Sequence, residues 1–159
     1  MSVDLNGNAY DARVGFRTSG IVRLFVAFKS NAESKGQLNG AHVIPTKYSM
    51  IAEEAEVSSR VSMDMGRGRV CDFAVIPHLK KRPDRIPVTQ PHRSDVVDHL
   101  SAALMPMARG RGELSADACD RRIPIFDGWQ RYDVQLSYRR IENVSGHGYD
   151  GPVVVCGAR

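Results

Sequence analysis

The sequence predicts a mainly β protein: a curved antiparallel sheet, arranged as a meander and half-barrel-like, with one short helix and a long Pro-rich loop. Three observations predict this class. Apolar and polar residues alternate over several segments on both sides of a single helical stretch, as expected where successive side chains point to opposite faces of a sheet. Turn signals separate these segments, and no β-α-β alternation occurs. Prolines interrupt residues 77–93, which therefore fit neither helix nor central strand.

The first half of the chain contains the clearest alternating runs. One expected strand covers residues 10–17, and a second extended run, after a short helical turn over 21–25, leads to the turn at Asn39-Gly40. A third run covers residues 44–52. The residues expected to face inward are Tyr10, Ala12, Val14 and Phe16 in the first run, and Ile44, Tyr48, Met50 and Ala52 in the third.

A β-hairpin is expected over residues 57–75. Residues 66–69, Gly-Arg-Gly-Arg, turn the chain between its two strands. The inward faces are Val57, Val61, Met63 and Met65, then Cys71, Phe73 and Val75. On this reading Cys71 is a small buried hydrophobic residue.

The single helix is expected to begin at Ser94, a residue type that caps helices, and to end before Pro106. Its apolar stripe is formed by Val96, Val97, Leu100, Ala103 and Leu104. Beyond it, Asp127-Gly128 indicates a turn into a strand over 131–139, with Tyr132, Val134, Leu136 and Tyr138 inward. A glycine-rich turn then leads to a last strand over 153–156.

Length and charge bound the function classes. With 159 residues the chain suits one β-rich domain, 1–159. Its formal charge of +4 mildly favours anionic partners, and no apolar run approaches the roughly 20 residues of a membrane span. The first ten residues lack the apolar region of a signal peptide, so we expect either a cytoplasmic chain or one whose leader is removed. Because the chain stops beside its last strand, we expect the domain to be incomplete at the C-terminus or covered there by a partner.

Constellations with catalytic residue types are sparse. Ser94, Asp98 and His99 lie close in sequence, but without the spacing of a known nucleophile motif, so a helix cap and a solvated helix face are favoured. The histidines at 78, 92 and 99, with Cys71 and Asp95, match no zinc spacing, and we predict no metal and no cofactor. Gly66-Arg67-Gly68 and the similar 110–112 continue into no phosphate-binding motif.

A basic segment within the Pro-rich loop is a candidate for contact with anionic groups. Its residues are Lys80, Lys81, Arg82, Arg85 and Arg93. Nucleic-acid modules usually add exposed aromatic side chains or a recognition helix, and this loop has neither. A surface strap with solvated charges is therefore favoured over nucleic-acid binding.

The three cysteines, at 71, 119 and 156, form no C-x-x-C pair. Cys119, in a loop, and Cys156, in the last strand, could form a disulfide, which would restrain the unfolded chain by roughly 3–4 kcal/mol. The residues alone leave the bond and two free thiols equally open.

Four blocks in order resemble the domain-of-unknown-function 3108 family. The first is 82–89 (RPDRIPVT) followed by His92-Arg93, and the second is 98–106 (DHLSAALMP). The third runs from Cys119-Asp120-Arg121 through 124–128 (PIFDG) to 131–133 (RYD), and the fourth is 148–156 (GYDGPVVVC). Together they cover most of residues 40–156.

The resemblance implies an exported, periplasmic protein of Gram-negative bacteria with an extended, curved antiparallel sheet and no established activity. It implies a signal peptide and further strands beyond the present sequence, so we expect truncation at both ends. The oxidising periplasm also favours the Cys119–Cys156 disulfide.

The leading hypothesis is therefore a non-enzymatic periplasmic or cell-envelope protein that binds a lipid, a lipoprotein or a partner chain on a concave β face. Its expected contact residues are the basic segment together with Tyr132 and Tyr138. A hydrolase using Asp98 and His99, or Asp127, is one alternative. The other is a weak binder of nucleic acid or another anionic surface through residues 80–93. The sequence predicts neither the ligand nor the oligomeric state.

Overall fold

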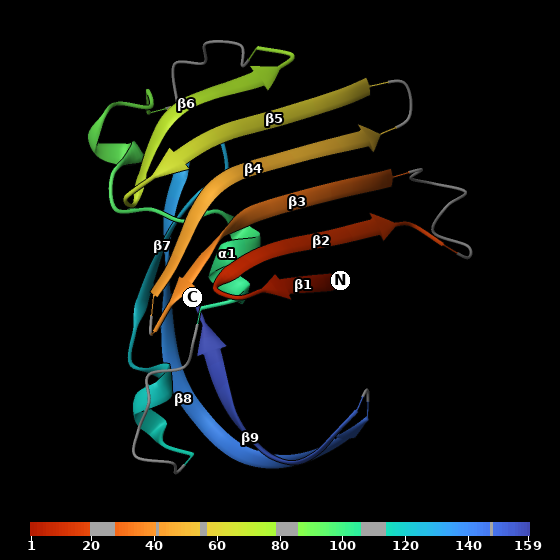
Figure 1. The fold of residues 1–159 in the computed structure, drawn as a ribbon, viewed down its shortest axis with the longest axis vertical. Helices are drawn as coiled ribbons and strands as arrows, with labels where there is room; N and C mark the ends of the chain where they lie inside the picture. Colours follow the sequence, from red (N-terminus) through yellow and green to blue (C-terminus); the bar gives the residue numbers. More distant parts are fainter. Residues whose placement is uncertain (20–27, 41, 55–56, 79–85, 106–113, 147) are drawn as a thin grey trace.

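A computed structural model describes residues 1–19, 28–40, 42–54, 57–78, 86–105, 114–146 and 148–159. The first half of the chain forms a six-stranded sheet in which each strand pairs antiparallel with the next (Figure 1). Its strands are β1 (Ser2–Asn6), β2 (Ala9–Arg17), β3 (Phe28–Asn39), β4 (His42–Glu54), β5 (Val57–Gly66) and β6 (Arg69–Ile76).

The second half forms a three-stranded antiparallel sheet. Its strands are β7 (Arg122–Phe126), β8 (Arg131–Gly146) and β9 (Tyr149–Ala158). Before it come the helix α1 (His99–Ala103) and two 3₁₀ turns, η2 (Pro91–Arg93) and η3 (Ala116–Cys119). Figure 1 shows β8 and β9 as a long, strongly bent hairpin that reaches beyond the six-stranded sheet. We call residues 138–152 of this hairpin the arm.

The segment Ser94–Val97 joins the two sheets by hydrogen bonds. Ser94 forms a bridge with Arg69 at the start of β6, and the Val96 N–H donates to the Gly68 carbonyl at 3.0 Å. Val97 then bridges β7 in parallel: its N–H donates to the Pro124 carbonyl, and its carbonyl accepts from the Phe126 N–H, both at 3.0 Å. Hydrogen bonding therefore runs from β1 to β9, in two sheets where the sequence predicts one.

The core lies on the inner face of the six-stranded sheet, beneath α1 and β7. Phe126 is fully buried there and meets Phe73 edge to face, with ring centroids 5.6 Å apart. The turn at Asp127-Gly128 packs so tightly that a Cβ at position 128 would lie 2.5 Å from Val61 Cγ1. Since φ of Gly128 is also +93°, only glycine fits this turn. The buried apolar residues of this core are Tyr10, Ala12, Val43, Tyr48, Val61, Met63, Met65, Val70, Val75, Val96, Leu100 and Phe126.

Two β-bulges change which side chains face inward. The register shifts at Lys35/Gly36, so Thr46 of β4 is an extra residue, and Ile44 lies on the outer face while Val43 is buried. A second shift at Asp64/Met65 pairs Met65 with Val70 and leaves Cys71 as the extra residue. The predictions that Ile44 faces inward and that Cys71 is buried are therefore wrong; Cys71 is an exposed free thiol.

The helix begins later than predicted. Asp98, not Ser94, is its N-cap, since Asp98 Oδ1 accepts from the N–H groups of Leu100 and Ser101, each at 3.0 Å. Val96 and Val97 are extended, because bridges to both sheets satisfy their backbone groups. The predicted stripe is thus helical only from Leu100 onward, and the predicted end at Pro106 lies outside the described residues.

Other expectations are confirmed. The hairpin over 57–75 forms, with Val61, Met63 and Met65 buried, and the strand over 131–139 forms within the longer β8. The helical turn expected over 21–25 lies outside the described residues. Strand β1 was not predicted, although its alternation and the Gly7-Asn8 turn, with φ of Gly7 at +59°, are hairpin signals. In the described part of the chain, no helix is long and apolar enough to span a membrane.

Candidate functional site

Large apolar side chains stay exposed on the inner face of the six-stranded sheet. Leu5 pairs with the buried Tyr10 and therefore points to the same face as the core. Phe16, six residues beyond Tyr10 in the unbroken alternation of β2, shares this face and is 63% exposed. Val57 of β5, on the face of the buried Val61, is equally exposed.

The second sheet has the same apolar character, which extends along β8 into the arm. Val134 and Leu136 pack against the buried Ile123 and Ile125 of β7. Tyr138 follows on the same face but is 44% exposed, and Ile141, returned to that face by a bulge between Tyr138 and Arg140, is 48% exposed. We define the inner apolar surface as Leu5, Phe16, Val57, Tyr138 and Ile141. All five side chains are exposed apolar groups on the core-facing sides of the two sheets.

A buried polar cluster fixes α1 to the six-stranded sheet. Asp98 is fully buried, and its Oδ2 accepts from Ser34 Oγ at 2.9 Å and from Ser101 Oγ at 2.5 Å. Ser101 Oγ also lies 2.6 Å from the Tyr10 hydroxyl. We call Tyr10, Ser34, Asp98 and Ser101 the Asp98 cluster. It connects α1 with β2 and β3, since Asp98 caps the helix and contacts β3 with the same carboxylate.

Burial sets the protonation behaviour of this cluster. Removal from water raises the pKa of the Asp98 carboxyl, while the hydrogen bonds from Ser101, Ser34 and Leu100 lower it and offset part of that rise. Burial likewise raises the pKa of Tyr10. The sheet makes room for the Tyr10 hydroxyl at Gly36, where a Cβ would lie 2.7 Å from that oxygen.

His99 points away from Asp98. It is exposed, its Nε2 hydrogen-bonds the Tyr132 hydroxyl of β8, and its ring centroid lies 6.2 Å from that of Tyr48. Asp98 instead directs its oxygens to Ser34, Ser101 and the helix N-terminus. Asp98 and His99 are neighbours in sequence but contact different groups. They therefore do not form the acid–base pair that the hydrolase alternative requires.

The remaining predicted catalytic residues also have structural partners. Ser94 Oγ donates to the Gln90 carbonyl at 3.2 Å. Asp127 Oδ1 accepts from the N–H groups of Trp129 and Gln130, each at 2.7 Å, and closes the turn before β8. Among the described residues, no group of three His, Cys, Asp or Glu side chains could hold a metal ion.

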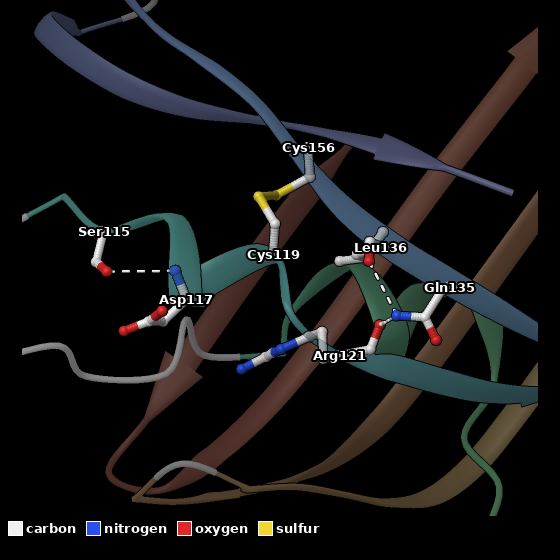
Figure 2. The surroundings of a disulfide bond; sticks show 7 residues. All are labelled: Ser115, Asp117, Cys119, Arg121, Gln135, Leu136 and Cys156. Atoms are coloured by element: carbon white, nitrogen blue, oxygen red, sulfur yellow. Dashed lines mark hydrogen bonds between the residues drawn. A yellow bond between two sulfur atoms is a disulfide. The ribbon is translucent and has the colours of Figure 1, made fainter.

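The disulfide between Cys119 and Cys156 ties η3 to β9 (Figure 2). The two Cα atoms are 5.5 Å apart and the cysteines are 37 residues apart in sequence. Cys119 is fully buried. Nearby, the Leu136 N–H donates to the Arg121 carbonyl at 2.9 Å, and the Gln135 side chain donates to the Leu136 carbonyl. The expected pairing is confirmed, and it anchors β9, next to the start of the arm, to the segment before β7.

The predicted binding residues separate into three places. Lys80, Lys81, Arg82 and Arg85 lie outside the described residues. Arg93 is half-buried, with its guanidinium 5.3 Å from the centroid of the Phe73 ring. Tyr132 lies at the base of β8 beside His99, whereas Tyr138 lies on the inner apolar surface. Of the tyrosines and Arg93, only Tyr138 presents an uncovered apolar side chain.

The outer face of the six-stranded sheet has a different character. A hollow of about 460 Å³ is lined by residues that include Lys35, Lys47 and Asp64. Lys47 Nζ lies 3.7 Å from Asp64, and Lys35 Nζ lies 3.2 Å from Asp11. The lining of the hollow holds two lysines, Lys35 and Lys47, and three carboxylates, Glu33, Asp64 and Asp72, so it carries a formal net charge of −1.

Sequence reasoning did not identify Tyr10, Ser34 and Ser101 as partners of Asp98. The spacing Asp98-x-x-Ser101 is a capping signal and could have placed the helix start. Ser34, 64 positions before Asp98, has no local signal. Leu5 and Phe16 were missed as surface residues because alternation predicts on which face of the sheet a side chain lies, and not whether another element covers it.

Comparison with known proteins settles the relationship that the four sequence blocks suggested. The family model described as "Protein of unknown function (DUF3108)" matches residues 1–158. The chain belongs to the DUF3108 family. The same comparisons found no match among curated proteins and none among solved structures.

Proposed function

We propose that this DUF3108 chain is a non-catalytic protein of the bacterial cell envelope that binds the acyl chain of a lipid or lipoprotein on its inner apolar surface. The observation that carries the proposal is the exposure of Leu5, Phe16, Val57, Tyr138 and Ile141 on the core-facing sides of both sheets. Grouped exposed apolar side chains commonly mark sites for apolar ligands or partners.

The disulfide supports the envelope location. Structural disulfides persist in oxidising compartments such as the periplasm and are rare in the reducing cytosol. The Cys119–Cys156 bond joins parts of the chain that no strand pairing connects directly. Expression of the gene product in its native host, followed by fractionation, tests the location. Recovery with cytosolic marker proteins and a reduced Cys119 would overturn it.

Lipid capture is tested by gentle extraction and native mass spectrometry. We expect the native chain to retain acyl-bearing molecules and Phe16→Ser to retain less. Ile76→Ser is the matched control, because Ile76 is an exposed apolar residue that pairs with Arg60, on the outer face of the same sheet. A native chain that never retains lipid, or equal loss in both variants, would contradict the proposal.

A further inference from the structure

The charged side chains of the six-stranded sheet lie on its outer face, away from the core. In the central strands, Lys35 pairs with Lys47 and Lys47 with Asp64, at positions that alternate with the core-facing ones. The described core-facing positions of β1–β6 hold apolar, small or hydroxyl-bearing residues, with a single charged exception at Glu54. The sign of that exception bears on what the inner apolar surface binds.

Strand pairing places Glu54 on the inner face. Glu54 is the direct partner of Val57 across the β4–β5 hairpin, and Val57 shares the face of the buried Val61. Directly opposite residues of an antiparallel pair point to the same face. The preceding residue, Glu53, points outward, where its carboxylate lies 3.9 Å from Lys29 Nζ. The two neighbouring glutamates therefore lie on opposite faces, and only Glu54 adjoins the inner apolar surface.

No cation neutralises Glu54 within the part of the chain that the structure describes. Glu54 is exposed at the end of β4, and the ion pairs of the described residues do not include it. The Arg93 guanidinium, which reaches the inner side, lies 5.3 Å from the centroid of the Phe73 ring. Phe73 pairs with Met63, which follows Val57 by six residues in β5, a separation of roughly 20 Å at the strand rise per residue. Glu54 thus gives its end of the inner apolar surface an uncompensated negative charge.

The arm carries the same sign on its inner face. In the alternation of β9, Asp150 shares the face of Val154, the partner of Ile141. Arg140 is on the other face, since it directly precedes Ile141 in β8. The Arg139 guanidinium also lies against β9 on that other face. The described strand residues on the inner faces of both sheets therefore include carboxylates and no lysine or arginine.

An acyl-bearing ligand has a polar end as well as an apolar chain, and the charge of Glu54 acts on that end. Opposite charges attract and like charges repel, more strongly where apolar neighbours exclude part of the water. An ammonium group carries three N–H donors for a carboxylate, whereas a second carboxylate has none to offer. An uncharged hydroxyl end lies between these two cases. Glu54 therefore discriminates among ligands by the charge of the head group.

We propose that Glu54 selects lipids whose polar end is a protonated amine. The apolar chain of the ligand lies on Phe16 and Val57, and its ammonium group pairs with the Glu54 carboxylate. Asp150 extends the same preference to the arm, and fatty-acid anions are disfavoured. The proposal rests on acyl-chain binding at the inner apolar surface and adds the head-group chemistry of the ligand.

Three single-chain amphiphiles of equal length test the selection: dodecylammonium, dodecanol and dodecanoate, each below its critical micelle concentration near neutral pH. Their displacement of Nile red, an uncharged fluorescent probe, gives the relative affinities. We expect the native chain to bind dodecylammonium about threefold more tightly than dodecanol, and dodecanoate about threefold more weakly, as for exposed ion pairs. The preference should shrink as added salt screens the charges.

Glu54→Gln tests the residue itself, and Glu53→Gln is the matched control. Both changes remove one negative charge at adjacent positions of β4, but Glu53 lies on the outer face beside Lys29. Glu54→Gln should reduce both affinity differences to less than about twofold, and Glu54→Lys should reverse their order. Glu53→Gln should keep the native order and size of the differences. Circular dichroism confirms the fold of each variant.

Dodecanol separates this proposal from the proposed function, because it has the chain without the charge. If the native chain binds dodecanol and Phe16→Ser weakens that binding, acyl-chain binding stands whatever the head-group result. Equal affinities for the three amphiphiles, tighter binding of dodecanoate, or the same response in Glu53→Gln as in Glu54→Gln would overturn the selection by Glu54 alone. If no amphiphile displaces Nile red, acyl-chain binding fails and the head-group selection fails with it.

Discussion

The region around α1, which we call the base, and the arm differ in how their residues are held. Around α1, side chains from β2, β3 and the helix converge on one buried carboxylate, and Phe126 packs against Phe73. In the arm, two strands run together with apolar groups exposed on both faces. Stability is therefore concentrated at the base, and the arm has apolar groups available for a ligand or another chain. Substitutions around α1 and in the arm test this contrast.

The largest contrast is expected between two aromatic truncations. Phe126→Ala removes a fully buried ring and should lower the free energy of unfolding by about 4 kcal/mol. Tyr138→Ala, on the exposed arm, should cost less than about 0.5 kcal/mol. Urea denaturation of both variants measures the difference. Equal losses would show that the arm is as tightly packed as the base.

Loss of the disulfide should come next. Replacing Cys119 and Cys156 by serine removes a cross-link over 37 residues, worth roughly 4 kcal/mol in the chain-entropy model. The arm should also exchange its amide hydrogens faster, while β2 and β3 change little. The Cys71→Ser variant is the control and should unfold like the native chain. Uniform acceleration across both sheets would contradict a local anchoring role.

Truncation of Asp98 should destabilise the junction by about 3 kcal/mol. Asp98→Ala leaves Ser34 and Ser101 without their acceptor and removes the helix cap. Asp98→Asn keeps the shape and one acceptor oxygen for the Leu100 and Ser101 N–H groups, so its loss should be smaller. Thermal denaturation ranks the three chains. An alanine variant as stable as the native chain would show that the Asp98 cluster does not contribute to the stability of the fold.

A smaller effect is expected from pH. Because burial raises the pKa of the Asp98 carboxyl in the folded chain, the folded state keeps its proton where the unfolded chain has lost it. The stabilisation from this proton is complete below the unfolded-state pKa and is lost as pH rises through the folded-state pKa. The native chain should therefore gain stability relative to Asp98→Asn on acidification. Parallel pH profiles for the two chains would contradict the raised pKa.

The same contrast explains what the sequence could predict. Local patterns placed the hairpin over 57–75, the turns at Asn39-Gly40 and Asp127-Gly128, and the alternation of β8, because each depends on residues near in the chain. The bulge at Cys71 depends on where Met65 meets its partner strand. The predicted helix start was wrong for a related reason, since hydrogen bonds to Gly68 and Pro124, which lie far away in the sequence, hold Val96 and Val97 in an extended conformation.

The candidate site was only partly predictable. Tyr132 and Tyr138 were both expected as contact residues. Tyr138 is exposed, whereas the Tyr132 hydroxyl is hydrogen-bonded to His99. Leu5 and Phe16 belong to the inner surface because α1 leaves them uncovered, and no local pattern contains that information. Family resemblance, rather than residue spacing, favoured the Cys119–Cys156 bond.

The segment Ser94–Val97 also has a consequence for the order of folding. Strands β1–β6 pair only with their neighbours in sequence, so these hairpins can form by local loop closure. Ser94–Val97 instead needs Gly68 behind it and Pro124 ahead of it, contacts that close longer loops. We expect it to dock late, after the meander exists as a template. Substitutions here should accelerate unfolding more than they slow refolding, in contrast to substitutions in the β5–β6 hairpin.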